Sequence, residues 1–121
     1  TVLAQQTSRT PLILIEDDRI LEIKGRFIYQ ERGDATESEF FMPLIEELKD
    51  KEIVGVRFEM DYYTREAFRM ISTMLAVIRR EGKKQKVYWY YEEGDEKVEQ
   101  DGRALESQLQ HLEFEFKELT P

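Results

Sequence analysis

The fold is decided by the stretch IVGVRFEMDYYTREAFRMISTMLAVIRRE, residues 53–81. Its first eight residues, Ile53 to Met60, place apolar side chains at every second position, which predicts a strand with one buried face. From Thr64 to Glu81 the apolar residues instead recur every three or four positions, which predicts an amphipathic helix. Gly82 follows where the C-cap of this helix is expected. The apolar stripe of the helix comprises Ala67, Phe68, Ile71, Met74, Leu75 and Ile78.

The segments on either side of this unit repeat the same two periods. Upstream, apolar runs over residues 12–15 and 20–25 flank the polar turn Glu16-Asp17-Asp18-Arg19, a pattern that predicts a β-hairpin. A helix follows from the capping-box pattern Thr36-Glu37-Ser38-Glu39, and it contains Pro43, which removes a backbone hydrogen bond. Downstream, the pattern predicts a strand over residues 87–92, a helix over 95–110 and a last strand over 112–116.

The predicted order, ββαβαβαβ, indicates one α/β domain over residues 11–121, preceded by a flexible N-terminal arm over residues 1–10. Helices that alternate with strands imply right-handed crossovers and a mixed, mostly parallel sheet, with the first strand as its antiparallel edge. Because the strands alternate rather than being apolar on both faces, we expect the helices mainly on one face of the sheet. The predicted core is Val54, Val56, Phe58, Ala67, Ile71, Met74, Leu75, Ile78, Val87, Trp89, Leu112 and Phe114.

Composition narrows the functional classes. The 121 residues are 40% hydrophobic and 36% charged, and no apolar stretch approaches the ~20 residues of a membrane helix. The absence of cysteine excludes disulfides and fits a cytoplasmic protein. The net charge of −8 disfavours nucleic-acid binding. Residues 65–86 nevertheless carry a net charge of +5, which indicates either a solvated helix face or a docking surface for an acidic partner.

The sequence offers little for catalysis. His111 is the one histidine, so the usual zinc patterns are excluded, and neither of the common glycine-rich nucleotide-binding motifs occurs. The acidic run Glu92–Glu96 lacks the spacing of a calcium loop and fits a solvated turn. We therefore expect no enzyme activity, no cofactor and no metal.

The junction Asp61-Tyr62-Tyr63-Thr64-Arg65-Glu66-Ala67 is the most informative candidate site. Thr64 stands where the helix needs an N-cap hydroxyl, and capping can be its only role. It can also be a phosphorylation site, because the free N–H groups of the helix and the nearby Arg65 and Arg69 would accommodate a phosphate. We predict Thr64 as the phosphosite and Tyr62, Tyr63, Arg65 and Arg69 as partner-binding residues.

Three short sequence motifs point to a family. Trp89-Tyr90-Tyr91-Glu92-Glu93-Gly94-Asp95, Phe40-Phe41-Met42-Pro43-Leu44 and Leu21-Glu22-Ile23-Lys24-Gly25 resemble the SiaC-type regulatory phosphoproteins, and Thr10-Pro11 also fits. The resemblance extends from about residue 10 to residue 117. It implies a fold like that of the STAS anti-sigma-factor antagonists, and it accounts for the proline inside a predicted helix.

The resemblance also implies a non-enzymatic partner switch. In this family a kinase phosphorylates a threonine at a strand-to-helix junction, a metal-dependent phosphatase removes the phosphate, and the unmodified form activates a diguanylate cyclase in cyclic-di-GMP and biofilm signalling. The family motif reads Tyr, an apolar or aromatic residue, Asn, Thr, Ser, Ser, whereas this chain has Tyr62-Tyr63-Thr64-Arg65-Glu66, in which Thr64 is the nearest match.

Two other functions fit the same residues. The chain can be a constitutive adaptor that lacks phosphoregulation, or a small-molecule-binding domain in which the aromatic strand Tyr88–Tyr91 forms a pocket wall. A deep polar pocket favours the second of these, whereas an exposed helix face beside Thr64 favours a switch or an adaptor.

Overall fold

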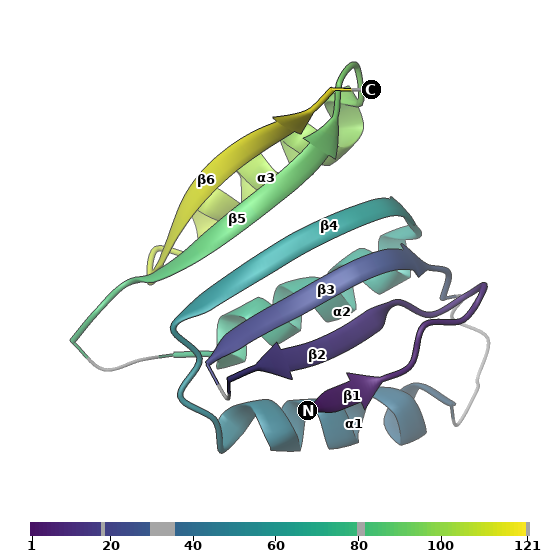
Figure 1. Ribbon diagram of the computed structural model, residues 1–121, viewed down its shortest axis with the longest axis vertical. Helices are drawn as coiled ribbons and strands as arrows, with labels where there is room; N and C mark the ends of the chain where they lie inside the picture. The colour runs from purple at the N-terminus through teal and green to yellow at the C-terminus, as the bar shows by residue number, and fades with distance from the viewer. Residues whose placement is uncertain (18, 30–35, 80–81, 121) are drawn as a thin grey trace.

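Six strands form one sheet and three helices connect four of them (Figure 1). The computed structural model describes residues 1–17, 19–29, 36–79 and 82–120, with the backbone alone for residues 36–40. The elements are β1 Val2–Ala4, β2 Leu12–Glu16, β3 Ile20–Phe27, α1 Thr36–Lys49, β4 Gly55–Tyr63, α2 Arg65–Val77, β5 Gln85–Glu92, α3 Glu96–Gln108 and β6 Leu112–Leu119.

The strands follow one another across the sheet in sequence order, β1-β2-β3-β4-β5-β6. β3, β4, β5 and β6 are parallel, whereas β2 is antiparallel to both of its neighbours. Each right-handed crossover moves one strand further in the same direction, so all three helices lie on one face of the sheet, behind the strands in Figure 1. The predicted α/β class, the mostly parallel mixed sheet and the one-sided helices are confirmed.

The N-terminal residues differ from the prediction. Val2–Ala4 form the edge strand β1, paired with β2, in a segment that we expected to be an arm. The order is therefore βββαβαβαβ, and the first strand of the predicted hairpin lies inside the sheet rather than at its edge. Three residues are too few to show an alternating pattern, so the sequence carried no signal for this strand.

The end of α2 differs from the prediction, whereas the start of α1 agrees with it. α2 ends at Val77 with Ile78 as its C-cap, so Gly82, at a φ of +78°, lies in the turn beyond and does not cap the helix. α1 begins at Thr36 as predicted and continues through Pro43. The side chains of the predicted capping box at its start lie outside the described residues.

The core lies between the sheet and the helices, and Trp89 is at its centre. The Trp89 ring is fully buried and stacks on Phe58 at 3.7 Å between centroids, while its Nε1 donates to the Val98 carbonyl at 2.8 Å. α3 packs closely here because Gly102 has no side chain: a Cβ atom would lie 2.6 Å from Trp89 Nε1. Every predicted core residue is buried except Val54, which is only partly buried because it precedes β4.

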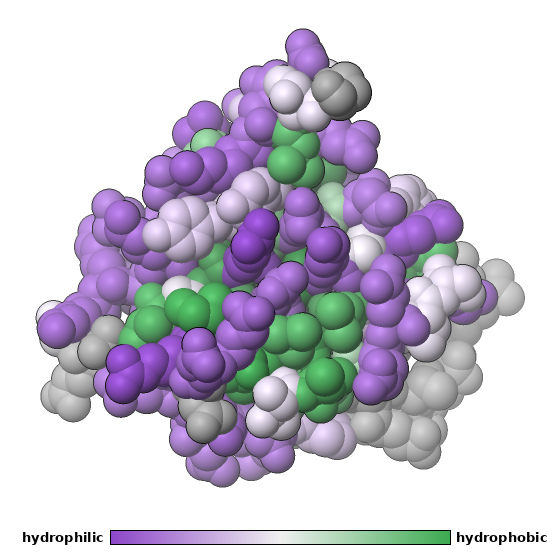
Figure 2. All heavy atoms as spheres, in the orientation of Figure 1, coloured by the Kyte–Doolittle hydropathy of each residue, from purple (hydrophilic) through white to green (hydrophobic). Residues whose placement is uncertain are grey.

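The opposite face of the sheet is uncovered in the described chain and faces the viewer in Figure 2. Its strands carry charged and aromatic side chains, including a Lys24–Glu59 ion pair at 3.5 Å and Arg57 over the Tyr90 ring at 5.0 Å. Apolar side chains gather over β1, β2 and β3, where Figure 2 shows a green area crossed by hydrophilic groups. Leu12, Leu14 and Ile20 are partly buried there, and Val2 is half exposed.

Candidate functional site

The candidate site lies where the parallel strand β4 gives way to α2. Tyr63 ends the strand, Arg65 begins the helix and Thr64 is the single residue between them. Thr64 has an extended backbone, with φ −81° and ψ 166°, and its Oγ1 accepts a hydrogen bond from the Ala67 amide at 3.3 Å. The prediction that Thr64 is the N-cap of this helix is confirmed.

A β-bulge just before Thr64 determines which tyrosine faces solvent. Gly25 of β3 pairs with Met60 and Arg26 pairs with Tyr62, so Asp61 is an extra residue on β4. An extra residue reverses the inward and outward alternation of the strand beyond it. Tyr62 is consequently 50% exposed, whereas Tyr63 is only 3% exposed. We predicted both tyrosines on a partner-binding surface, and for Tyr63 this is corrected: its ring lies in the core.

The Thr64 hydroxyl also contacts a distant part of the chain. Its Oγ1 donates to the Tyr29 carbonyl at 2.7 Å and accepts from the Tyr29 amide at 3.1 Å, across 35 residues of sequence. The Thr64 amide donates to the Phe27 carbonyl at 3.1 Å. These bonds leave Thr64 partly buried. Its hydroxyl is thus at the surface but fully engaged, and no sequence pattern indicates that Tyr29 is its partner.

The helix α3 completes the site from the other side. A hollow of about 370 Å³ is lined by Tyr62, Tyr63, Thr64, Arg65, Phe68, Lys97 and Asp101. Tyr63 donates its phenolic proton to Asp101 Oδ2 at 2.6 Å, and Lys97 Nζ lies 3.2 Å from the same oxygen. Burial, and next the hydrogen bond to Asp101, raises the pKa of Tyr63 well above its ordinary value. Sequence reasoning missed both α3 residues, because only the packing of α3 brings them here.

Three cationic side chains belong to this region, of which Arg65 and Lys97 line the hollow and Arg69 does not. Arg65 and Arg69 are exposed one turn apart on α2, and no carboxylate in the part of the chain that the structure describes forms an ion pair with either. Lys97 is the third, and it also lies over the Tyr63 ring, 4.3 Å from the centroid. Of the predicted residues, Tyr62, Thr64 and Arg65 therefore line one hollow, and Arg69 is exposed on the same helix as Arg65.

The other candidates have structural positions. His111 Nε2 lies 3.0 Å from the Leu75 carbonyl oxygen, which fits a side chain that ties β6 to α2. Among the described residues, no three or more histidine, aspartate or glutamate side chains gather where they could hold a metal ion. The aromatic strand is not a single wall, because Trp89 faces the helices while Tyr88 and Tyr90 lie on the uncovered face.

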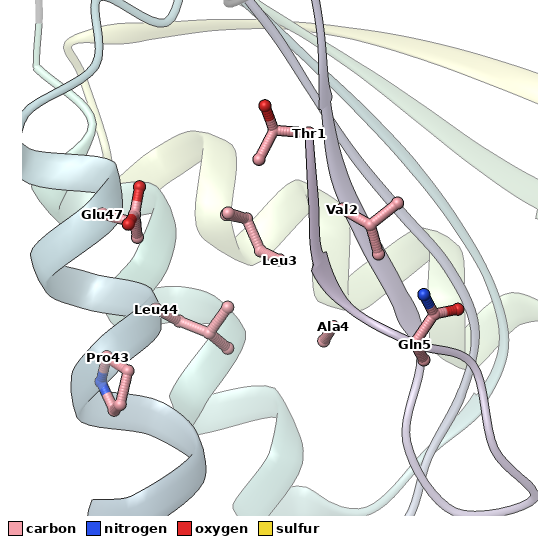
Figure 3. Close-up of a pocket in the computed structure, with 8 residues that line it drawn as sticks. All are labelled: Thr1, Val2, Leu3, Ala4, Gln5, Pro43, Leu44 and Glu47. Atoms are coloured by element: carbon pink, nitrogen blue, oxygen red, sulfur yellow. The ribbon is translucent and has the colours of Figure 1, made fainter.

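A second hollow lies between β1 and α1, away from Thr64 (Figure 3). It has a volume of about 550 Å³. In Figure 3 the Leu3 and Leu44 side chains point toward each other across it, with Glu47 at one end and Gln5 at the other. This lining is largely aliphatic and includes none of the predicted site residues.

The comparisons with known proteins identify the family and the fold. The family model described as SiaC family regulatory phosphoprotein matches residues 4–119. A search of curated protein sequences finds no match. Within the described residues, no helix has the length and apolar character needed to cross a membrane.

Two solved structures show the same fold. One is SiaC of Pseudomonas aeruginosa, at a TM-score of 0.64 and 14% identity, with 98% of this chain and 96% of that chain covered. The other is a chain in the crystal structure of the diguanylate cyclase SiaD in complex with its activator SiaC from Pseudomonas aeruginosa. It matches at a TM-score of 0.69 and 18% identity, with 96% of this chain and 96% of that chain covered. Since the family model spans nearly the whole sequence, the chain belongs to the SiaC family of regulatory phosphoproteins.

Proposed function

We propose that this chain is a non-enzymatic partner switch, set by reversible phosphorylation of Thr64, whose unmodified form binds and activates a diguanylate cyclase. Two findings support the proposal: the family is one of regulatory phosphoproteins, and a structural neighbour is SiaC, the activator of the cyclase SiaD. A protein kinase and a metal-dependent phosphatase would set the state of Thr64 in the cytoplasm.

The position of Thr64 is the observation on which this proposal rests. Among the residues of the site, it combines a hydroxyl, a helix N-terminus and a surface hollow. A phosphate adds about −1.5 to −2 charges at pH 7, and the N-terminus of a helix stabilises negative charge. Arg65 and Lys97 line the same hollow and would offset this charge. The domain can thus accept the modification without unfolding.

The surface around Thr64 suits an acidic partner. Arg65 and Arg69 present positive charge beside the half-exposed ring of Tyr62, in a chain whose net charge is −8. Aromatic and arginine side chains are enriched in protein interfaces. A phosphate on Thr64 would place two negative charges in front of the acidic partner and add the cost of desolvating them. We expect release of the partner as the outcome.

Co-purification from the native host tests the switch. The bait would be this protein in three forms: unmodified, with phosphothreonine incorporated at position 64, and with phosphothreonine at position 73 as a matched control on the same helix. Unmodified protein and the control should retain a diguanylate cyclase and raise its cyclase activity, whereas the position-64 form should not. Equal recovery of the cyclase with all three forms would refute the switch.

A second candidate is a constitutive adaptor without phosphoregulation. It is favoured by one observation, the three hydrogen bonds that already engage the Thr64 hydroxyl and restrict its access to a kinase. The adaptor predicts the same partner but no phosphate on Thr64 in native cells.

A further inference from the structure

Two hydrogen bonds join Thr64 to Tyr29, and we call this contact the Thr64–Tyr29 clasp. One hydroxyl holds both backbone groups of Tyr29, since Oγ1 donates to its carbonyl at 2.7 Å and accepts from its amide at 3.1 Å. An ordinary N-cap needs neither bond, because the cap itself is the third bond, from the Ala67 amide. The clasp is therefore an additional feature of this junction.

The clasp fixes the point where the chain leaves β3. Tyr29 lies two residues beyond Phe27, the last residue of that strand. Ile28 is held separately, because its amide donates to the Arg9 carbonyl at 2.7 Å. Loss of the clasp would thus remove two hydrogen bonds from the Tyr29 backbone, while the Ile28 amide keeps its bond to Arg9 and the Tyr29 side chain keeps its packing against the core.

Phosphorylation is chemically incompatible with the clasp. Transfer of a phosphoryl group from a nucleoside triphosphate forms the bond between Oγ1 and phosphorus, breaks the bond from phosphorus to the nucleoside diphosphate and releases the hydroxyl proton. The modified Oγ1 has no proton to donate to the Tyr29 carbonyl. The phosphate oxygens are also negative, and they would stand beside a carbonyl oxygen now held at 2.7 Å from Oγ1.

We propose that the clasp is the conformational part of the switch. Unmodified Thr64 holds the backbone of Tyr29 against the start of α2, and phosphorylation opens the clasp and releases that backbone from Thr64. This rests on the phosphorylation of Thr64 proposed above, and it adds that a partner can read a changed backbone as well as a changed charge. The same contact slows modification, because the hydroxyl must leave Tyr29 before a kinase can reach it.

Residue-resolved amide hydrogen exchange by NMR tests the clasp without any kinase. Four forms are compared: wild type, Thr64→Ser, which keeps the hydroxyl, Thr64→Val, which keeps the shape and loses the hydroxyl, and protein with phosphothreonine incorporated at position 64. Thr73→Val is the matched control, since its hydroxyl donates only to the Arg69 carbonyl of the same helix. The amides of Phe58 and Trp89 report on the stability of the core.

The Tyr29 amide should exchange at least tenfold faster in the Thr64→Val and phosphothreonine forms than in wild type. Thr64→Ser and Thr73→Val should stay within threefold of wild type, and the core amides of Phe58 and Trp89 should rise by a smaller factor than Tyr29, set only by the loss of global stability. Equal exchange of Tyr29 in the wild-type and phosphothreonine forms would overturn the clasp, as would a parallel rise in the core amides. Phosphate found elsewhere in native cells would instead refute the proposed phosphosite, so the two failures are distinguishable.

Discussion

Two strand-to-helix junctions stand side by side at the same edge of the sheet and use the same local device. At the β4–α2 junction Thr64 accepts from the Ala67 amide at 3.3 Å, and at the β5–α3 junction Asp95 accepts from the Val98 amide at 3.2 Å. Both residues stand directly before the first residue of their helix. The capping geometry alone does not distinguish a switch from an ordinary helix start.

The difference lies in what else each cap touches. Thr64 reaches Tyr29 and lines a hollow with two cations. Asp95 carries a fixed negative charge in an acidic turn, and α3 is held instead through the core by Trp89 and Gly102. The β4–α2 junction therefore has the contacts on which the proposed switch depends, whereas α3 is anchored through the core.

The largest expected effect breaks the core contact that holds α3. Trp89→Ala removes the stack on Phe58 and the hydrogen bond to Val98, and it should lower the free energy of unfolding by about 3–5 kcal/mol. Tyr88→Ala, one residue earlier but on the uncovered face, should cost about 1 kcal/mol or less. Urea denaturation measures both, and similar losses would contradict the assignment of the two faces.

The second prediction compares the two caps directly. Asp95→Ala should cost about 0.5–2 kcal/mol, the usual value for a lost N-cap. Thr64→Ala should lower the free energy of unfolding by this cap loss and by a further ~1–3 kcal/mol, because the two backbone groups of Tyr29 lose their partner as well. Urea denaturation of the two variants under one set of conditions tests this. Equal losses would mean that the contact with Tyr29 contributes nothing.

The third prediction uses the raised pKa of Tyr63. Because burial and Asp101 raise this pKa, folded protein keeps the phenolic proton at pH values where the unfolded chain has lost it. The resulting stabilisation is present below the unfolded pKa near 10 and falls as pH rises above it, by up to about 1.4 kcal/mol per pH unit. Urea denaturation between pH 8 and pH 11 should show this fall in wild type and a smaller one in Tyr63→Phe. Parallel profiles would contradict it.

The smallest effect concerns Lys97. The Lys97 side chain is 67% exposed in its ion pair with Asp101, so Lys97→Gln should change the stability of the unmodified protein by less than about 1 kcal/mol. In protein with phosphothreonine at position 64, Lys97→Gln should lower the stability more, because the phosphate then lacks the positive charge of Lys97 in the same hollow. Melting temperatures of both forms measure the difference, with Lys86→Gln on β5 as the control. An equal change in melting temperature in the two forms would mean that Lys97 does not contribute to the switch.

Local features of the fold and site could be predicted because they depend on short-range periodicity. The alternation over Val56, Phe58 and Met60 and the stripe over Ala67 to Leu75 are visible in the sequence and correspond to β4 and α2. The cap at Thr64 follows from residue type and position. The order of the later elements follows in the same way, and right-handed crossovers then place the helices on one face.

The remaining features depend on long-range contacts or on a change of period. The bulge at Asp61 exchanges the orientations of Tyr62 and Tyr63, and nothing in the residue types announces it. Tyr29 and Asp101 reach the site across 35 and 38 residues of sequence. Such contacts depend on how separate elements pack, which a local pattern does not encode.

The most direct test of the central claim is the position of the phosphate on this protein as it occurs in its native cells. Protein isolated with phosphatase inhibitors would be digested, and its phosphopeptides would be sequenced by mass spectrometry. We expect phosphate on Thr64, in a fraction that falls when the phosphatase is active. Phosphate confined to Ser72, Thr73 or a tyrosine, with Thr64 always unmodified, would contradict it.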